Sequence, residues 1–393
     1  MSATIHVLVG TRKGAFIYSS DRKRERWEVS APLLAGWEIF HMAAGQRSGP
    51  PRLYAAANNP WWGPSIAKSS DGGKTWDQRS PGLGFPADMG LTIENVWFVK
   101  PGHESQPGVV YAGTQPAGLF RSEDDGASWS SVDGINRHEF RSFFQGIGET
   151  PQARSPLHSI EIDPRDPDHI YLAVSGGGSY ETKDGGESWQ IFSHRALPSE
   201  PRKEMFVSQA LSNVPPGVDP VAVWDMHKLV LDRKDPDRLW TQAHSGVFRS
   251  DDGGQSWEDV TPPRLDLVVR PAAPTPGVYG FHGFPIAVTH RRPDAAYLLP
   301  LQADDFRVCP GQFTVYRTRD GGRIWDALTN GLPGPHDYQS AYREGMDVDG
   351  LDAEGIYVGT SNGHTYASTD GGDGWQKLPG TLPPILSVNC AVY

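Results

Sequence analysis

The stretch from Ser69 to Trp76 reads SSDGGKTW, and the chain repeats this pattern along its length. Strict copies run from Ser122 to Trp129, from Thr182 to Trp189 and from Ser250 to Trp257, and looser copies run from Thr318 to Trp325 and from Ser368 to Trp375. In the shared pattern, Ser/Thr-x-Asp-x-Gly-x-Ser/Thr-Trp, the aspartate can accept backbone N–H bonds inside a tight turn. The glycine adopts a positive φ at low cost, and the tryptophan anchors the turn on a core. The pattern therefore predicts a recurring hairpin turn.

Short β-type runs surround each copy, and the fourth unit shows the order clearly. Residues 158–163 alternate like a strand, residues 164–167 form a Pro-rich turn, and residues 169–174 predict a second strand. A third strand is expected over 179–182 and a fourth over 189–192, on the two sides of the repeated turn. Four antiparallel strands of this kind make one blade of a β-propeller.

Counting these units predicts an all-β chain that forms a single seven-bladed β-propeller of four-stranded antiparallel blades. Six units are complete, whereas the N-terminal unit lacks a first strand and the C-terminus has a spare strand at 385–392. We expect this C-terminal strand to pair into the N-terminal blade and close the ring, which leaves no open sheet edge. The expected blades are 1–32 with 384–393, 37–80, 92–133, 157–195, 224–262, 282–330 and 343–380.

The repeated turn resembles the Asp box, also called the BNR repeat. Sialidases, sortilin-type receptors, some xyloglucan-cleaving enzymes and a photosystem assembly factor carry this motif. The resemblance implies a β-propeller with the box on the turn between the third and outermost strands of each blade. It implies no single activity, because one fold supports many functions.

Composition excludes several classes of function. The formal net charge of −11 argues against nucleic acid as a partner, because nucleic-acid binders need a basic face. No apolar run is long enough to cross a membrane, and two cysteines make no disulfide framework. The N-terminal residues do not read as a secretory signal, so a cytoplasmic location is expected.

Histidines begin equivalent inner strands in three successive blades and suggest a metal site on the propeller axis. The predicted metal ligands are His158, His227, His244 and His282. Imidazole suits zinc, iron and manganese, and three histidines with an open position can activate water. This pattern favours a divalent-metal-dependent hydrolase or lyase with no organic cofactor. The alternative interpretation is that each histidine only hydrogen-bonds a neighbouring loop.

The same face collects further polar and aromatic residues that suggest a small-molecule substrate. The predicted catalytic residues are Glu94, Asp304 and Arg343, with Glu94 or Asp304 as the proton carrier. The predicted substrate-binding residues are Asn59, Trp61, Trp62, Gln115, Gln302 and Arg307.

Two further functions stay open from the sequence. A glycoside hydrolase, sialidase-like or otherwise exo-acting, could pair Glu94 with Asp304 or Asp305, and Trp61 and Trp62 would suit stacking on a sugar. Sialidases carry an Arg-Ile-Pro motif in their first blade, and this chain has none there. A non-catalytic assembly or binding scaffold is the third possibility. In every case we expect the boxes to be structural, because they lie on the face opposite the site.

Overall fold

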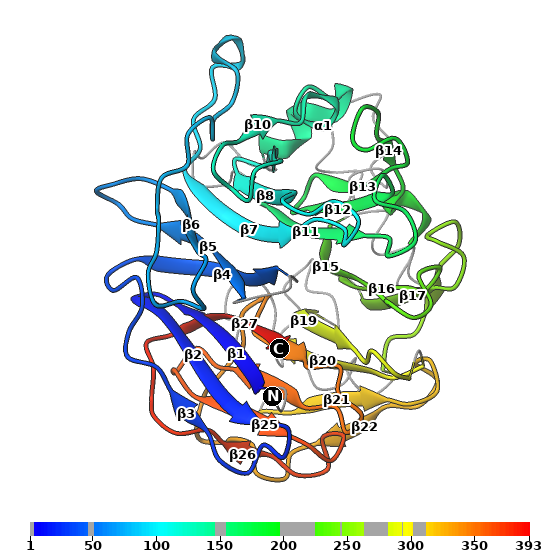
Figure 1. Ribbon diagram of the computed structural model, residues 1–393. Helices are drawn as coiled ribbons and strands as arrows, with labels where there is room; N and C mark the ends of the chain where they lie inside the picture. Colours follow the sequence, from blue (N-terminus) through cyan, green and yellow to red (C-terminus); the bar gives the residue numbers. More distant parts are fainter. Residues whose placement is uncertain are drawn as a thin grey trace.

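The computed structural model describes residues 4–45, 51–145, 155–196, 225–243, 246–262, 282–292, 294–301 and 312–393. Seven antiparallel sheets stand around a common axis (Figure 1). Six of these sheets have four strands and one has three, and in the three-stranded sheet an isolated bridge between Lys68 and Asp77 stands where the fourth strand would be. The prediction of a seven-bladed all-β propeller is therefore confirmed.

The first strand of each blade lies next to the axis, and neighbouring first strands contact one another around the ring. From blade one to blade seven they are β27 (Ile385–Val392), β4 (Glu38–Gly45), β7 (Asn95–Pro101), β11 (Leu157–Ile162), β15 (Met226–Leu231), β19 (His282–Val288) and β23 (Met346–Val348). The second strands are β1 (Thr4–Thr11), β5 (Arg52–Asn58), β8 (Val110–Gln115), β12 (Ile170–Val174), β16 (Leu239–Ala243), β20 (Ala296–Leu301) and β24 (Ile356–Gly359).

The third and outermost strands flank the repeated turn. The third strands are β2 (Gly14–Asp21), β6 (Ser65–Ser69), β9 (Leu119–Ser122), β13 (Gly178–Thr182), β17 (Gly246–Ser250), β21 (Val315–Thr318) and β25 (Thr365–Ser368). The outermost strands are β3 (Glu28–Val29), β10 (Ser130–Ser131), β14 (Gln190–Ile191), β18 (Glu258–Asp259), β22 (Asp326–Leu328) and β26 (Gln376–Lys377). The described helices are short: α1 (Asp133–Asn136), η1 (Ala87–Met89), η2 (Glu139–Gln145) and η4 (Ser193–Arg195).

The two chain ends meet in blade one and close the ring. Strand β27 pairs antiparallel with β1, with Val392 opposite Ile5 and Val388 opposite Val9. Figure 1 shows the N- and C-terminal labels side by side. The predicted closure is confirmed: the last strand supplies the first strand that the N-terminal blade lacks.

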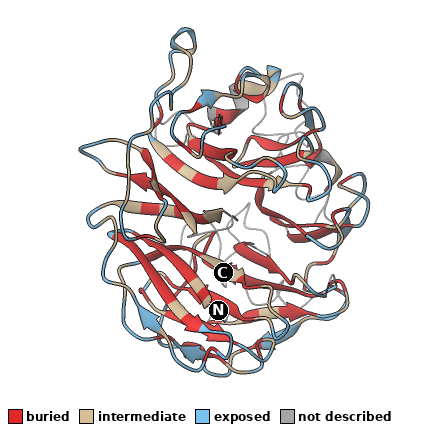
Figure 2. Cartoon of the chain, in the orientation of Figure 1, coloured by how far each residue is buried: buried red, intermediate tan, exposed pale blue. Residues whose placement is uncertain are grey.

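Apolar side chains between neighbouring blades form the core. Trp240, Tyr171 and Phe248 are among the largest fully buried side chains. Figure 2 shows the strands buried along most of their length, with exposed residues in the outer turns. Because every blade buries a face against the next blade, the core is a ring of interfaces rather than one central cluster.

The repeated turns are closed by internal hydrogen bonds, and the residues of the motif make these bonds. In the copy of blade four, Asp184 Oδ1 accepts the backbone N–H of Ser188 at 2.9 Å, and Thr182 Oγ1 accepts the N–H of Gly186 at 3.1 Å. Gly186 has a φ of 100°, which favours glycine. The indole of Trp189 donates to the Gly186 carbonyl at 3.1 Å and packs into the core. Each part of the motif therefore has a structural partner, and the likeness to Asp-box proteins in particular stays a prediction.

Candidate functional site

The first strands all begin at one end of the ring, which we call the entry face. The loops between second and third strands reach the same end, since Glu38 at the start of β4 lies opposite Asn58 at the end of β5. The repeated turns follow the third strands and therefore lie on the opposite face. The predicted site residues therefore lie at one end of the blades, and the boxes lie at the other end.

In successive blades the first strand has a β-bulge near the entry face, and this bulge changes the direction of one side chain. One extra residue interrupts the pairing of the first and second strands in blades two to five, namely Phe40, Trp97, His158 and His227. Register shifts of the same kind occur in β19 around Phe284 and in β27 around Leu386. Bulges bend a strand and redirect a side chain, so these residues occupy equivalent places around the axis.

His227 is held by three groups at the entry face. Its Nδ1 lies 2.7 Å from the carbonyl oxygen of Gly283, so this nitrogen carries the proton and donates it. The imidazole stacks on the ring of Phe284 with 4.5 Å between centroids. Its Nε2 lies 3.5 Å from Oδ2 of Asp225. The imidazole is thus fixed with Nε2 directed toward a carboxylate.

His158 lies next to His227 and is fully buried. Its Nδ1 is 3.0 Å from Ser159 Oγ, and its Nε2 has no hydrogen-bond partner among the described residues. Burial holds the pKa of His158 well below its usual value, and the positive charge of Arg343 lowers this pKa further. The negative charge of Asp225 raises the pKa of His158, but burial has the larger effect, so His158 stays neutral near pH 7. A neutral imidazole can accept or donate a proton at Nε2 or ligate a metal.

Two charged side chains reach across the axis from blade seven. The guanidinium of Arg343 lies 4.8 Å from the centroid of Phe284 and 3.2 Å from Ser175 Oγ in blade four. Glu344 forms a buried ion pair with Lys228 of blade five at 2.9 Å. Arg343 and Glu344 therefore tie blade seven to blades four and five at the entry face.

The remaining predicted residues divide into two groups. Glu94 is exposed just before β7, and Gln115 bonds the neighbouring Asn95 side chain at 3.0 Å. Asn59 forms the turn that carries Trp61 and Trp62, and both tryptophans are exposed. Outside the described residues lie His244, Gln302, Asp304, Arg307 and the side chain of His282.

Asp225 was missed by the sequence analysis, because the feature that marks it becomes visible only when the strands are paired. Asp225 stands two residues before the bulged His227, and Glu38 stands two residues before the bulged Phe40. Aligning the repeats on the bulged residue would have placed both carboxylates at one equivalent position. The half-exposed carboxyls of Glu38 and Asp225 thus belong to blades two and five, which are nearly opposite in a ring of seven.

Within the described ranges, no group of three or more His, Cys, Asp or Glu side chains is arranged to hold a metal ion. His158 and His227 are brought together, whereas the other two predicted ligands are not described. The predicted zinc, iron or manganese site therefore stays a prediction.

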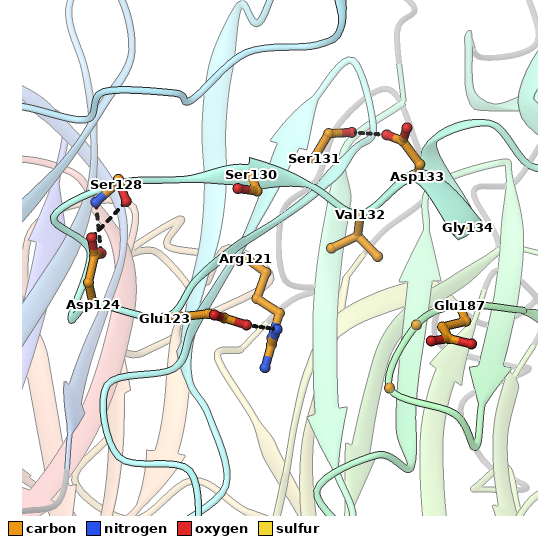
Figure 3. Close-up of a pocket in the computed structure, with 12 residues that line it drawn as sticks. Arg121, Glu123, Asp124, Ser128, Ser130, Ser131, Val132, Asp133, Gly134 and Glu187 are labelled. Atoms are coloured by element: carbon orange, nitrogen blue, oxygen red, sulfur yellow. Dashed lines mark hydrogen bonds and ion pairs between the residues drawn. The ribbon is translucent and has the colours of Figure 1, made fainter.

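A hollow of about 680 Å³ opens on the box face between blades three and four (Figure 3). Arg121, Glu123 and Asp133 line it together with the box residues Asp124 and Ser128. Asp124 is already bonded to Ser128, and Arg121 is paired with Glu123. These polar groups satisfy one another, so we place the functional site at the entry face instead. No helix in the described part of the chain is long and apolar enough to cross a membrane.

No protein-family model matches this chain. The chain is 24% identical over 369 residues to a xyloglucanase from Paenibacillus sp., covering 90% of this chain and 30% of that protein. It is 27% identical over 225 residues to an oligoxyloglucan-reducing end-specific xyloglucanase from Emericella nidulans, covering 55% of this chain and 25% of that protein. A photosystem II assembly lipoprotein from Synechococcus sp. is 27% identical over 208 residues, covering 49% of this chain and 55% of that protein. The matched region spans only between a quarter and a third of the length of the xyloglucanases from Paenibacillus sp. and Emericella nidulans.

Solved structures with the same architecture support the fold. An ancestral GH74 enzyme superposes with a TM-score of 0.55 at 18% identity, covering 86% of this chain and 38% of that chain. A 6-phosphogluconolactonase-like protein from Bacteroides uniformis superposes with a TM-score of 0.56 at 11% identity and covers both chains fully. At these identities the likeness shows a shared propeller fold and no shared activity.

Proposed function

We propose that this chain is a glycoside hydrolase that acts on a glucan-type oligosaccharide at the entry face. The proposal draws on the sequence similarity to two xyloglucan-acting enzymes, one of which matches 90% of the chain. It replaces the metal-dependent hydrolase or lyase that the sequence analysis favoured as the first choice. The glycosidase alternative from the sequence has the better support.

Two carboxyl groups are the chemical requirement of most glycosidases, and we assign this role to Glu38 and Asp225, which stand at equivalent positions of blades two and five. Their side chains are 34% and 25% exposed, so each is partly open to solvent. They come from nearly opposite blades and would flank a sugar that lies on the axis. Arg12 donates to Glu38 at 2.7 Å and fixes the orientation of that carboxylate.

Asp225 is the proposed proton carrier of the pair. His227 Nε2 lies 3.5 Å from Asp225 Oδ2 and can exchange a proton with it. Glu38 would act on the opposite side of the sugar ring, as nucleophile or as base toward a water molecule. The observation that carries this assignment is that two partly exposed carboxyls and two exposed tryptophans share one face of the ring.

The test is release of reducing sugar from xyloglucan, cellulose and other glucan oligosaccharides. We expect activity from the wild type, and Glu38→Gln or Asp225→Asn should lower kcat by about 10²- to 10⁴-fold with an unchanged melting temperature. Glu28→Gln on the outer strand β3 is the matched control, since Glu28 is exposed and far from the entry face. Absence of hydrolysis on every glucan, or full activity of Asp225→Asn, would refute the proposal.

A second candidate function is a divalent-metal-dependent hydrolase or lyase. It is favoured by one observation: the buried Nε2 of His158 lacks a hydrogen-bond partner within the described part of the chain, and His158 lies near His227. Elemental analysis after mild chelation and reloading should then find stoichiometric metal in the wild type and much less in His158→Ala. Wild-type protein without bound metal would eliminate this candidate.

A further inference from the structure

We infer that Arg141 forms a carboxylate-binding subsite on the entry face, between blades three and four, and that this subsite takes a uronate residue of an acidic saccharide. The inference rests on the proposed function for the saccharide and deepens it, because it assigns a charge to the substrate class. Glu38 and Asp225 belong to blades two and five. The uronate is therefore a further unit or branch of the saccharide, beside the unit at this carboxyl pair.

The contacts of Arg141 place its guanidinium at the entry face. Its Nη1 donates to the carbonyl oxygen of Ala117, in the loop between β8 and β9 of blade three. The guanidinium carbon lies 5.0 Å from the ring centroid of Phe85 and 5.1 Å from that of Phe144. Phe144 packs against the equivalent loop of blade four, where a Cβ added at Gly177 would lie 3.2 Å from its ring. The two phenyl rings thus hold the guanidinium over the junction of blades three and four.

One edge of this guanidinium has no acceptor. Nε and Nη2 of Arg141 are buried and make no hydrogen bond within the described part of the chain. Burial lowers the pKa of Arg141 only to about 10, so the side chain stays charged at pH 7. A buried charge without a counter-charge is costly to the fold. Arg141 therefore holds a positive charge that nothing in the described chain neutralises.

Other arginines of this chain show what such a charge normally receives. Three buried arginines each pair with at least one carboxylate: Arg24 with Asp349, Arg249 with Asp251 and Glu258, and Arg317 with Asp326 and Asp373. Arg137, four residues before Arg141, is paired with Asp88 and Asp133. Arg141 has no such partner among the described residues, so a ligand is the group that would supply the carboxylate.

The geometry of the unused edge selects the chemical class of the ligand. The Nε–H and Nη2–H groups of a guanidinium point in parallel and match the two oxygens of one carboxylate. Because Nη1 already donates to Ala117, this edge is the one left for a ligand. Arg141 as a whole residue is half-buried, so its side chain lies at the border of the protein and the solvent. On a pyranose, the C6 carboxylate of a uronate supplies the required group.

The experiment compares binding of cellobiouronate and cellobiose, which differ only in the carboxylate, to the full chain by calorimetry. An Asp225→Asn background preserves the ligands. Cellobiouronate should bind about ten- to hundredfold more tightly than cellobiose, the effect of one charge-assisted bidentate contact. Arg141→Met should remove this preference and leave the affinity for cellobiose unchanged. Arg79→Met, which removes an exposed arginine paired with Asp77, is the control for the lost charge and should keep the preference.

A purely structural role for Arg141 predicts a different result. If the guanidinium served only to hold the two phenyl rings, Arg141→Met would lower the melting temperature and leave the preference for the acid unchanged, which would refute the subsite. Under the inference, ligand-free Arg141→Met melts at the wild-type temperature or above it, because a buried unpaired charge is removed. Arg141→Lys keeps the charge but lacks the planar fork, so it should retain only a small part of the preference. The Lys variant decides the question if the Met variant does not fold.

The outcomes separate this inference from the proposed function. Equal affinity for cellobiouronate and cellobiose, or a preference that persists in both Arg141 variants, would refute the subsite. If acetate displaces cellobiouronate at the concentration at which glucuronate does, the carboxylate binds without its sugar and the saccharide assignment is wrong. A wild type that hydrolyses neutral glucans without any preference for the acid keeps the hydrolase and loses the subsite. An Arg141-dependent preference in a protein that hydrolyses no glucan keeps the subsite and loses the hydrolase.

Discussion

At the scale of single residues, the repeated aspartate is the group whose role the chemistry defines best. In blade four Asp184 accepts hydrogen bonds from Ser188 and Thr182, and the first of these lowers its pKa most. The pKa of Asp184 falls to about 2. The aspartate of the third blade, Asp124, behaves in the same way through Ser128.

This lowered pKa predicts an acid dependence of stability. A carboxyl whose pKa is lower in the folded chain stabilises the fold above its unfolded value of about 4 and loses this contribution as the pH falls toward about 2. Asp184→Ala should therefore lower the free energy of unfolding at pH 7, and the difference from wild type should shrink between pH 4 and pH 2. Denaturant unfolding across this range measures it. Glu187→Ala in the same turn is the control, and a difference independent of pH would contradict the account.

Residues of the site were predicted unevenly, and the reason is local geometry. His158 and His227 could be predicted because both begin equivalent strands in the repeat. Asp225 could not, because its relation to Glu38 depends on a bulge that adds one residue to the strand. Hydrophobic alternation does not show such an insertion until the strand pairing is known.

At the scale of elements, the contacts between blades hold the ring together. Blades one and seven share a buried ion pair in which Arg24 Nε lies 2.9 Å from Asp349 Oδ2, and both side chains are almost fully buried. Asp349 also accepts the Tyr357 hydroxyl at 2.9 Å and the backbone N–H of Gly355 at 3.0 Å. Arg24 lies in the eroded turn of blade one, so this pair occupies a place where the repeat motif is missing.

Removing one partner of this buried pair should be costly. Asp349→Ala should lower the free energy of unfolding by about 3–5 kcal/mol, because it leaves the Arg24 charge buried without its carboxylate. Asp352→Ala removes only the exposed ion pair with Arg291 and should cost less than about 1 kcal/mol. Chemical denaturation of both variants makes the comparison. If both variants lost the same free energy of unfolding, the buried pair between the blades would stabilise the fold no more than an exposed pair.

At the scale of the whole molecule, the fold was predictable from the sequence, whereas the grouping of the site residues was not. Six copies of the turn, a missing first strand and a spare last strand determine seven blades and their closure. Glu38 and Asp225 are far apart in the sequence and belong to blades two and five. Only the closed ring brings these two blades to one face, so no local sequence pattern indicates that the two carboxyls share it.

Ring closure through β27 should dominate global stability. Deleting residues 385–393 removes the strand that pairs with β1 and exposes a long edge in blade one. We expect a sharp fall in the melting temperature and increased aggregation. Removing Tyr393 alone takes away the terminal pairing with Thr4 and one ring contact with His6, and it should have a small effect. An unchanged melting curve for the long deletion would contradict closure by this strand.

The most direct test of the central claim is to locate ligand binding by hydrogen–deuterium exchange. The claim is that this propeller binds a glucan chain at its entry face. With a long xyloglucan oligosaccharide bound to Asp225→Asn, we predict slower exchange in segments 10–14, 37–42, 58–64 and 225–231. Segments 121–134 and 184–188, around the box-face hollow, should exchange as in the free protein. Protection confined to the box face, with none at the entry face, would contradict the account.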